Sequence, residues 1–209
     1  MKKNLLLILF LLSGAIPAAS QKHTVRVGWG DMMYETAVFH ASPSHTFVTP
    51  SALPEDFSVR EKFGYGYTGH IFAEYLYRAG RNVRLGGMMD FEGIFWKEAD
   101  FDRYHNVKGA VQNVNNYDLS LIPTVRFDYF NHETVSLYSV LGLGLLMAFD
   151  NIGGFELSPV SDFHLIGVEV GRGHWAGAAE FGFMTALYAG NKVYMLGSKL
   201  ISLSVNYRW

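Results

Sequence analysis

The chain has 209 residues, of which 22 are glycine, none is cysteine and 15% are aromatic. Its formal charge of −2 at pH 7 argues against nucleic acid as a partner, because nucleic-acid-binding chains carry an excess of basic residues. The lack of cysteine excludes disulfide bonds and thiolate metal sites.

The first 20 residues have the pattern of a signal peptide. Lys2 and Lys3 precede an apolar run over 5–12, which is too short to cross a bilayer as a helix and so disfavours an uncleaved anchor. Ala18 and Ser20 fit the small residues that precede a cleavage site, and we predict that the mature chain begins at Gln21. Removing the two lysines leaves 15 basic and 19 acidic residues, a formal charge of −4. The chain is therefore divided into an export signal, 1–20, and one domain, 21–209.

Apolar and polar residues alternate along eight stretches, which predicts eight strands. We expect them over 23–30, 65–78, 83–96, 117–130, 135–149, 161–172, 175–186 and 197–209. Short turns join the second strand to the third, the fourth to the fifth and the sixth to the seventh. Longer segments, 31–64, 97–116, 150–160 and 187–196, join the others. This alternation predicts an up-and-down meander with all short turns at one end.

The alternation does not itself say which face of each strand is inside. A soluble barrel turns its apolar faces inward, whereas a membrane barrel turns them outward. Eight strands enclose an interior that is barely wide enough for side chains, and rows of Tyr, Phe, Trp and Leu would overfill it. The other faces carry small and charged residues, which suit a narrow interior. We therefore predict an all-β, eight-stranded antiparallel transmembrane β-barrel, with a secreted soluble barrel as the alternative.

Three stretches resemble a known family. YDLSLIPTVRFDYF, HLIGVEVGRGHWAGAAEFGF and the ending LSVNYRW are similar to the small outer membrane protein β-barrel family of Gram-negative bacteria, related in shape to OmpA and OmpX. The resemblance implies an eight-stranded barrel and no particular activity. It also implies that the last strand, through Val205, Tyr207 and Trp209, is a signal for the barrel assembly machinery. Trp209 departs from the commonest final residue of that signal, which is Phe.

Pro123 is unusual for a strand in the middle of a closed barrel. Proline lacks the N–H group that a central strand donates to its neighbour, and a closed barrel has no edge strand on which this loss is harmless. We predict a local bulge or a missing hydrogen bond at this residue.

Charged residues on the polar faces are the first candidates for a function. If the apolar faces point outward, these residues lie inside, where charges must be paired. Because the two signs are balanced and eight-stranded barrels rarely leave an aqueous channel, we predict an ion-pair network that plugs the interior. A narrow porin-like conductor of ions or small solutes is the first alternative. The residues are Arg26, Glu74, Arg78, Arg84, Asp90, Glu92, Arg126, Asp128, Glu169, Glu180 and Arg208.

A lipid A-modifying hydrolase is the second alternative. Lipid A deacylase barrels use a His-x-Ser pair with a Glu, and the segment 31–64 offers His40, Ser42 and Glu35. The pair lies in a proline-containing loop, however, and a His-x-Ser triplet is common by chance. We therefore expect no catalysis.

The remaining candidates are metal sites and outer loops. The eight histidines are scattered singly, apart from His40 and His45, so no metal and no cofactor is expected. The predicted loops 31–64 and 97–116 are candidates for binding lipopolysaccharide or another surface partner. The sequence thus predicts a monomeric barrel in the outer membrane of a Gram-negative bacterium, in contact with its lipid and lipopolysaccharide. Its expected role is structural or surface-interaction.

Overall fold

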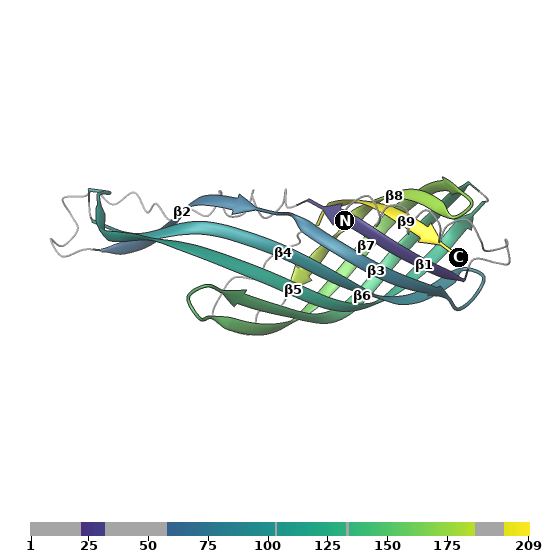
Figure 1. The fold of residues 1–209 in the computed structure, drawn as a ribbon, viewed down its shortest axis with the longest axis horizontal. Coiled ribbons are helices and arrows are strands. Elements are labelled where there is room, and N and C mark those ends of the chain that lie inside the picture. Colours follow the sequence, from purple (N-terminus) through teal and green to yellow (C-terminus); the bar gives the residue numbers. More distant parts are fainter. Residues whose placement is uncertain (1–21, 32–57, 103, 133, 187–198) are drawn as a thin grey trace, which may run out of the picture.

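The computed structural model describes residues 22–31, 58–102, 104–132, 134–186 and 199–209. The predicted export signal and most of the predicted loop 31–64 lie outside these ranges. Within them are nine strands (Figure 1): β1 (His23–Gly30), β2 (Val59–Tyr67), β3 (His70–Arg78), β4 (Val83–Phe101), β5 (Val107–Asn131), β6 (Val135–Asp150), β7 (Phe155–Arg172), β8 (Trp175–Ala186) and β9 (Ile201–Arg208). No helix in this part of the chain is long and apolar enough to cross a membrane.

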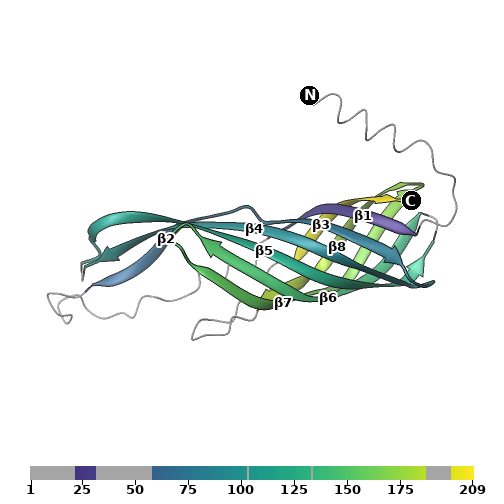
Figure 2. The same cartoon turned by 60° about the horizontal axis from the view of Figure 1, so that its bottom comes forward.

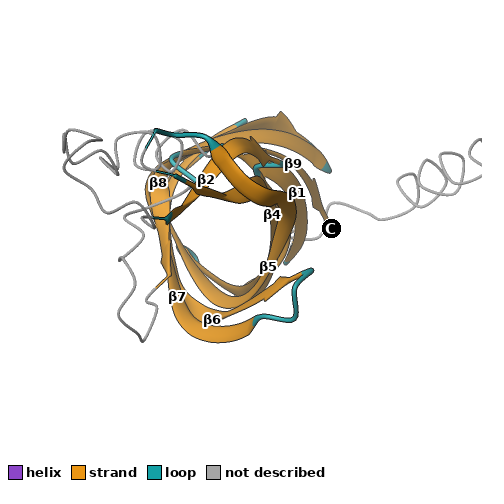
Figure 3. Ribbon diagram, turned by 90° about the vertical axis from the view of Figure 1, so that its left-hand side faces the viewer, coloured by secondary structure: helices purple, strands orange, loops and turns teal. Residues whose placement is uncertain are grey.

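Eight of these strands close into an antiparallel barrel. The ring runs through β1, β3, β4, β5, β6, β7, β8 and β9 and returns to β1. The closing pair joins the first and last strands, from Thr24 opposite Arg208 to Gly30 opposite Ser202. Figure 3 shows the ring along the barrel axis. The predicted all-β, eight-stranded antiparallel barrel is therefore confirmed, and closure leaves no unpaired strand edge in its wall.

The predicted second strand, 65–78, is wrong as a single strand. It is divided at Thr68 and Gly69 into β2 and β3. Gly69 has a φ of 72°, and a Cβ at this position would meet the carbonyl oxygen of Gly30 at 2.7 Å. The Trp29 indole N–H donates to the Thr68 carbonyl oxygen at 3.0 Å, which secures the break against β1. A left-handed glycine thus separates β2 from the barrel strand β3 that follows it.

The outer segments of three strands project from the barrel as a ribbon. We use "ribbon" for β2 together with residues 94–101 of β4 and 107–116 of β5. Figures 1 and 2 show it extending from the end opposite the short turns. Most of 97–116, which we predicted to be a loop, is strand, with a turn at 102–106. The predicted loop 150–160 likewise shortens to 151–154. These segments pair with one another although their polar residues give little apolar alternation, and the register shifts once in each pairing, between Phe63 and Gly66 and between Glu98 and Asp100.

The barrel has apolar side chains outside and charged side chains inside. On the outer surface, Val27, Leu143 and Leu203 are 56–66% exposed. In the interior, Arg26 and Arg126 are at most 1% exposed. The outward direction of the apolar faces is therefore confirmed. The short turns at 79–82, 132–134 and 173–174 lie at one end, with the start of β1 and the end of β9 (Figure 1). We call this the turn end, and the opposite end the outer end.

A β-bulge changes which residues of β7 face inward. The register with β8 shifts between His164 and Ile166, and both Leu165 and Ile166 are about half exposed. Before the bulge the even-numbered Asp162 and His164 are buried, and after it the odd-numbered Glu169 is buried. One extra residue on a strand reverses the side to which the rest of it points. Simple alternation therefore assigns only part of this strand correctly.

The ladder is interrupted at Pro123. In the pairing of β5 with β6, Leu121 lies opposite Leu145 and Thr124 opposite Gly142, but the two residues between are not paired. The register is the same on both sides of the gap, so there is no bulge. The pairing with β4 continues through Pro123, which lies opposite Gly87. The predicted loss of pairing at this proline is thus confirmed, and it affects one neighbour only.

Candidate functional site

The interior charges form two clusters along the barrel. The turn-end cluster comprises Arg26, Arg84, Arg126, Arg208, Glu74, Asp128, Glu169 and Glu180. The outer cluster comprises His70, Asp90, Glu92, Asp162, His164 and Lys199. The first contains four guanidinium groups and four carboxylates, whereas the second contains three carboxylates, one ammonium group and two imidazoles.

Near the turns, two carboxylates are shared among three arginines. Asp128 accepts from Arg84 Nε at 2.9 Å and from Arg126 Nε at 2.7 Å. Glu169 accepts from Arg126 Nη1 at 2.8 Å and from Arg208 Nη1 at 3.1 Å. Each carboxylate thus uses both oxygens, which satisfies most of its hydrogen-bonding capacity away from water.

Arg26 is held between two glutamates from different strands. Its Nη1 lies 2.6 Å from Glu74 Oε2 on β3, and its Nη2 lies 2.5 Å from Glu180 Oε1 on β8. The remaining oxygens accept hydroxyl hydrogen bonds, from Thr124 to Glu74 at 2.7 Å and from Ser202 to Glu180 at 3.0 Å. Because these groups come from β1, β3, β5, β8 and β9, the contacts cross the interior from wall to wall.

Tyr138 connects the two arginine positions. Its ring centroid lies 3.5 Å from the Arg126 guanidinium carbon and 5.8 Å from that of Arg26. Tyr138 is 0% exposed, so these cation–π contacts are shielded from water, where such contacts contribute most. The ring also fills space that Gly167 leaves open, because a Cβ at Gly167 would collide with it.

A buried apolar cluster adjoins both charged clusters. On β3, Phe72 is placed between Glu74 and His70 on the inward face. The cluster consists of Phe72, Met88, Ile122, Leu146, Ala148, Val160, Met184 and Ala186. It makes one part of the narrow interior apolar, and beside it His164 and Glu180 bring the two charged clusters to within 3.7 Å.

The outer cluster is arranged around Lys199 and His70. Lys199 Nζ lies 3.1 Å from Asp90 Oδ2 and 3.9 Å from Asp162 Oδ1. His70 Nδ1 lies 2.7 Å from Asp90 Oδ1. His164 Nδ1 lies 3.5 Å from Asp162 and 3.7 Å from Glu180, so it borders the turn-end cluster. Most of these contacts are longer than the arginine–carboxylate contacts of the turn-end cluster.

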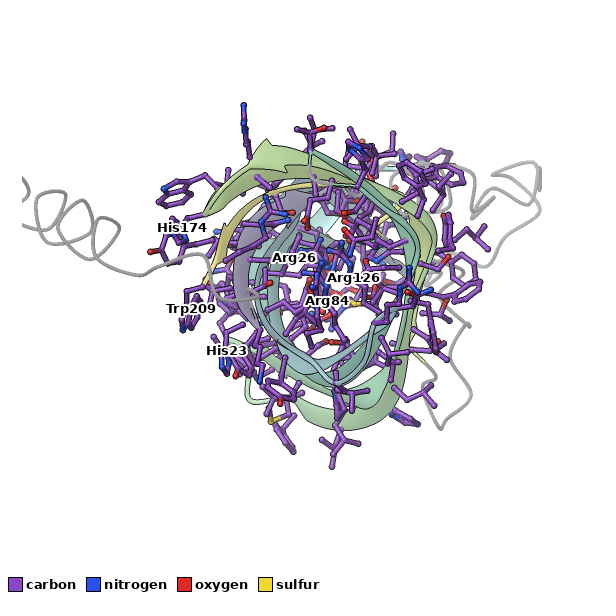
Figure 4. The ribbon with its side chains drawn as sticks, turned by 90° about the vertical axis from the view of Figure 1, so that its right-hand side faces the viewer. His23, Arg26, Arg84, Arg126, His174 and Trp209 are labelled. Carbon is purple, nitrogen blue, oxygen red and sulfur yellow. The ribbon has the colours of Figure 1, made fainter. Side chains whose placement is uncertain are left out.

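The structure brings most of the predicted interior residues together. All are 4% exposed or less except Arg78 and Arg208, which are half-buried at the turn end. Figure 4 looks into the barrel from this end, with Arg26, Arg84 and Arg126 inside the ring. Asp90 and Glu92 belong to the outer cluster, where Glu92 Oε2 lies 3.5 Å from His70 Nε2.

Lys199, Asp162 and His164 are interior residues that the sequence did not predict. By alternation with Ile201 and Leu203, Lys199 would point outward, but its φ of 62° turns it from that pattern, and it is 0% exposed. Asp162 and His164 lie before the bulge of β7, on the opposite parity from Glu169. The polar type of Asp162 was a usable signal, whereas nothing local indicated the left-handed Lys199.

The last strand carries aromatic residues at the turn end. Val205 is 58% exposed, and Tyr207 packs edge-on against Trp175 with ring centroids 4.9 Å apart. Trp209 stacks on His23 at 5.6 Å, and the backbones of these two residues exchange hydrogen bonds of 3.0 Å. His23, His174 and Trp209 lie on the outside of the ring in Figure 4. The residues of the predicted assembly signal therefore belong to an aromatic rim that joins the two ends of the barrel wall.

The other predicted candidates can be placed only in part. Glu35, His40 and Ser42, the hydrolase alternative, lie outside the described residues. So does most of the candidate loop 31–64. In the described ranges, no group of three or more His, Asp or Glu residues has an arrangement that could hold a metal ion.

Comparison with known proteins finds little similarity in sequence. No protein-family model matches the chain, and no curated protein matches it. Among solved structures, one similar fold is that of the outer membrane protein Ail of Yersinia pestis, determined in a phospholipid bilayer nanodisc. The match has 14% identity and a TM-score of 0.38, and it covers 91% of this chain and 100% of that chain. This likeness is too low to support any conclusion about function.

Proposed function

We propose that this chain is an integral outer-membrane barrel of a Gram-negative bacterium, with a structural or surface-interaction role and without catalysis. The observation that carries the proposal is the reversed polarity of the barrel, with large apolar side chains outside and charged ones inside. In water, so many exposed apolar side chains on every strand would promote aggregation. In a bilayer the same surface meets hydrocarbon, and the closed ladder satisfies the backbone where no water is available.

We further propose that the interior is plugged. The support is the turn-end cluster, in which Arg26 connects opposite walls through Glu74 and Glu180 at 2.6 and 2.5 Å. An ion crossing the barrel would have to displace these paired charges, which lie among the buried side chains that fill the interior. A narrow conductor remains the alternative function, because a rearranged cluster would open a polar path.

The conductance of the mature protein tests this proposal. After refolding, a heat-sensitive shift on an electrophoresis gel establishes that the barrel has formed, and a planar bilayer then reports its current. We expect insertion without steady current. Reproducible current steps that change in Glu74→Gln or Arg126→Gln would overturn the plug. Arg60→Gln is the matched control, because Arg60 pairs with Asp100 at 3.2 Å on the exposed ribbon.

The ribbon is the element that we propose for surface interaction. Among the described strands, β2 pairs with β4 alone, and residues 107–115 of β5 also pair with β4 alone. At each margin of the ribbon, the described strands pair on one side only, and its exposed side chains offer a surface for a partner. We propose lipopolysaccharide or another surface molecule as its partner. Loss of lipopolysaccharide binding after replacement of 94–116 by a short turn, with the barrel still heat-modifiable, is the expected result.

The remaining proposals concern biogenesis and assembly state. We propose that the barrel is monomeric and that β9 is read by the barrel assembly machinery through Val205, Tyr207 and Trp209. The support is their position on the outer face of the closing strand. Trp209→Ala is expected to slow insertion catalysed by the purified machinery, whereas Trp175→Ala on the neighbouring strand leaves it close to normal. Equal insertion rates for the two variants would contradict the proposal that the machinery reads Trp209.

A further inference from the structure

The outer wall of the barrel contains a groove over β4 near the turn end. Its volume is about 500 Å³, and it lies between β3 and β5. The exposed side chains that border it are Val25, Ala73, Tyr75, Met89, Leu121 and Pro123. Glu74 also borders it, but its carboxylate is bound inside by Arg26 and Thr124. The groove is thus an apolar depression in the surface that the proposed function exposes to lipid.

Gly87 forms the floor of this groove, and packing does not require a glycine there. The neighbouring Gly86 is different, because a Cβ at that position would collide with the Tyr75 carbonyl oxygen. At Gly87 a Cβ would meet only the Ile122 carbonyl oxygen, at 4.0 Å. The flanking partners are Tyr75 on one side and Pro123 on the other. Gly87 therefore leaves a gap in the outer surface, at a position where a large apolar side chain would fit. Most other outward-facing positions of the barrel carry such a side chain.

The turn end below the groove is basic. In the described ranges, every charged side chain at this end that is exposed or half-buried is a cation. These are Lys22, Arg78, Arg81, Arg172 and Arg208. Arg81 lies in the turn between β3 and β4, directly continuous with the groove's walls, and the Lys22 carbonyl accepts from the Arg78 N–H at 2.7 Å. Tyr75, at the groove's border, directs its hydroxyl to His23 Nδ1 at 2.7 Å.

We propose that this groove binds one anionic phospholipid, with an acyl chain along Gly87 and the head-group phosphate at Lys22 and Arg81. The inference rests on the proposed function, because it requires the barrel to lie in a bilayer. The apolar depression favours a hydrocarbon chain through close van der Waals packing, because a chain inside a bilayer is already out of water. The exposed cations of the described residues at the turn end favour a negative head group. Lys22 precedes β1 and Arg81 lies in the turn between β3 and β4, so both cations are at the turn end of strands that border the groove.

Native mass spectrometry of lipids retained by the refolded protein tests the site. The mature chain is inserted into nanodiscs of phosphatidylcholine containing a minor fraction of phosphatidylglycerol and is then transferred to mild detergent. We expect the unchanged protein to retain phosphatidylglycerol in preference to phosphatidylcholine. Gly87→Leu fills the groove and is expected to lower that retention about tenfold. If Gly87→Leu folds poorly, Ala73→Leu takes its place in the test. It fills the groove from β3 and should lower the retention of phosphatidylglycerol to a similar extent.

Matched controls separate the site from general membrane effects. Gly177→Leu adds the same side chain to the outer face of β8, where nothing lies within 4 Å of a Cβ, and should leave retention unchanged. Lys22→Ser with Arg81→Ser should abolish the preference for the anionic lipid, whereas Arg172→Ser on another turn should not. Equal retention by the unchanged protein, Gly87→Leu and Gly177→Leu would overturn the site alone. Failure of the unchanged protein to insert would overturn the proposed function and, with it, the site.

Discussion

The two charged clusters of the interior are built differently. In the turn-end cluster, guanidinium groups reach carboxylates at 2.5–3.1 Å, and the two charge types are equal in number. In the outer cluster, one ammonium group and two imidazoles face three carboxylates, with several contacts of 3.5–3.9 Å. Arginine offers several donors in a fixed plane, whereas lysine offers a single point charge. We therefore expect the loss of one cation to destabilise the protein more in the turn-end cluster than in the outer cluster.

The largest effect is expected from Arg26→Met. The substitution leaves Glu74 and Glu180 buried without their shared cation, which should lower the free energy of unfolding by about 3–5 kcal/mol. Urea unfolding of the mature protein in phospholipid vesicles measures this change. Arg60→Met removes an exposed pair and should cost less than about 1 kcal/mol. Similar losses for the two variants would contradict the role given to the turn-end cluster.

Lys199→Met tests the outer cluster in the same assay. Asp90 keeps its hydrogen bond with His70, and Asp162 keeps its neighbour His164, so neither carboxylate loses every partner. We expect a loss of about 2–3 kcal/mol, smaller than that of Arg26→Met. A larger loss than for Arg26→Met would reverse the comparison between the clusters.

Tyr138→Leu is expected to have a smaller effect. It removes the ring that lies over Arg126 while keeping an apolar side chain, and shielded cation–π contacts of this kind are worth about 1–2 kcal/mol. Tyr138→Phe retains the ring and should stay close to the unchanged protein. If both variants lose the same amount, the hydroxyl and not the ring is the important group.

The smallest expected effect is local and lies in the ribbon. In the 102–106 turn, a backbone hydrogen bond from Asn106, followed by one from its side chain, lowers the pKa of Asp102 below its usual value. A lowered pKa stabilises the turn above the ordinary aspartate pKa, and this contribution is lost as pH falls through the lower value. Amide protection of Tyr104 and Asn106, which donate to Asp102 at 2.8 Å, should therefore decrease in acid. Asp102→Ala should remove the pH dependence of this amide protection. If the protection in that variant still decreased in acid, the titration of Asp102 would not be its cause.

The sequence predicted the barrel because alternation and turn length are local properties. It placed Arg26, Glu74 and Glu180 on inward faces for the same reason. It could not predict their mutual contacts, because these residues are far apart in the chain and meet only through closure. The bulge at Leu165 and the left-handed Lys199 each shift the alternation by one residue, and the sequence carries no period that marks such a shift. Residues 59–64, 97–101 and 107–116 of the ribbon were predicted to be loop, because their polar residues hide an alternating pattern.

The continuity of β4 and β5 from ribbon to barrel has a mechanical consequence. Each strand runs without interruption from the exposed hairpin into the wall, and β5 alone has 25 residues, or roughly 80 Å of chain at about 3.3 Å per residue. A force applied to the hairpin acts parallel to these strands and perpendicular to their hydrogen bonds, so it loads the ladder in shear. Many bonds then share the load at once instead of opening one after another. The ribbon is thus joined to the barrel wall through many backbone hydrogen bonds that resist the force together.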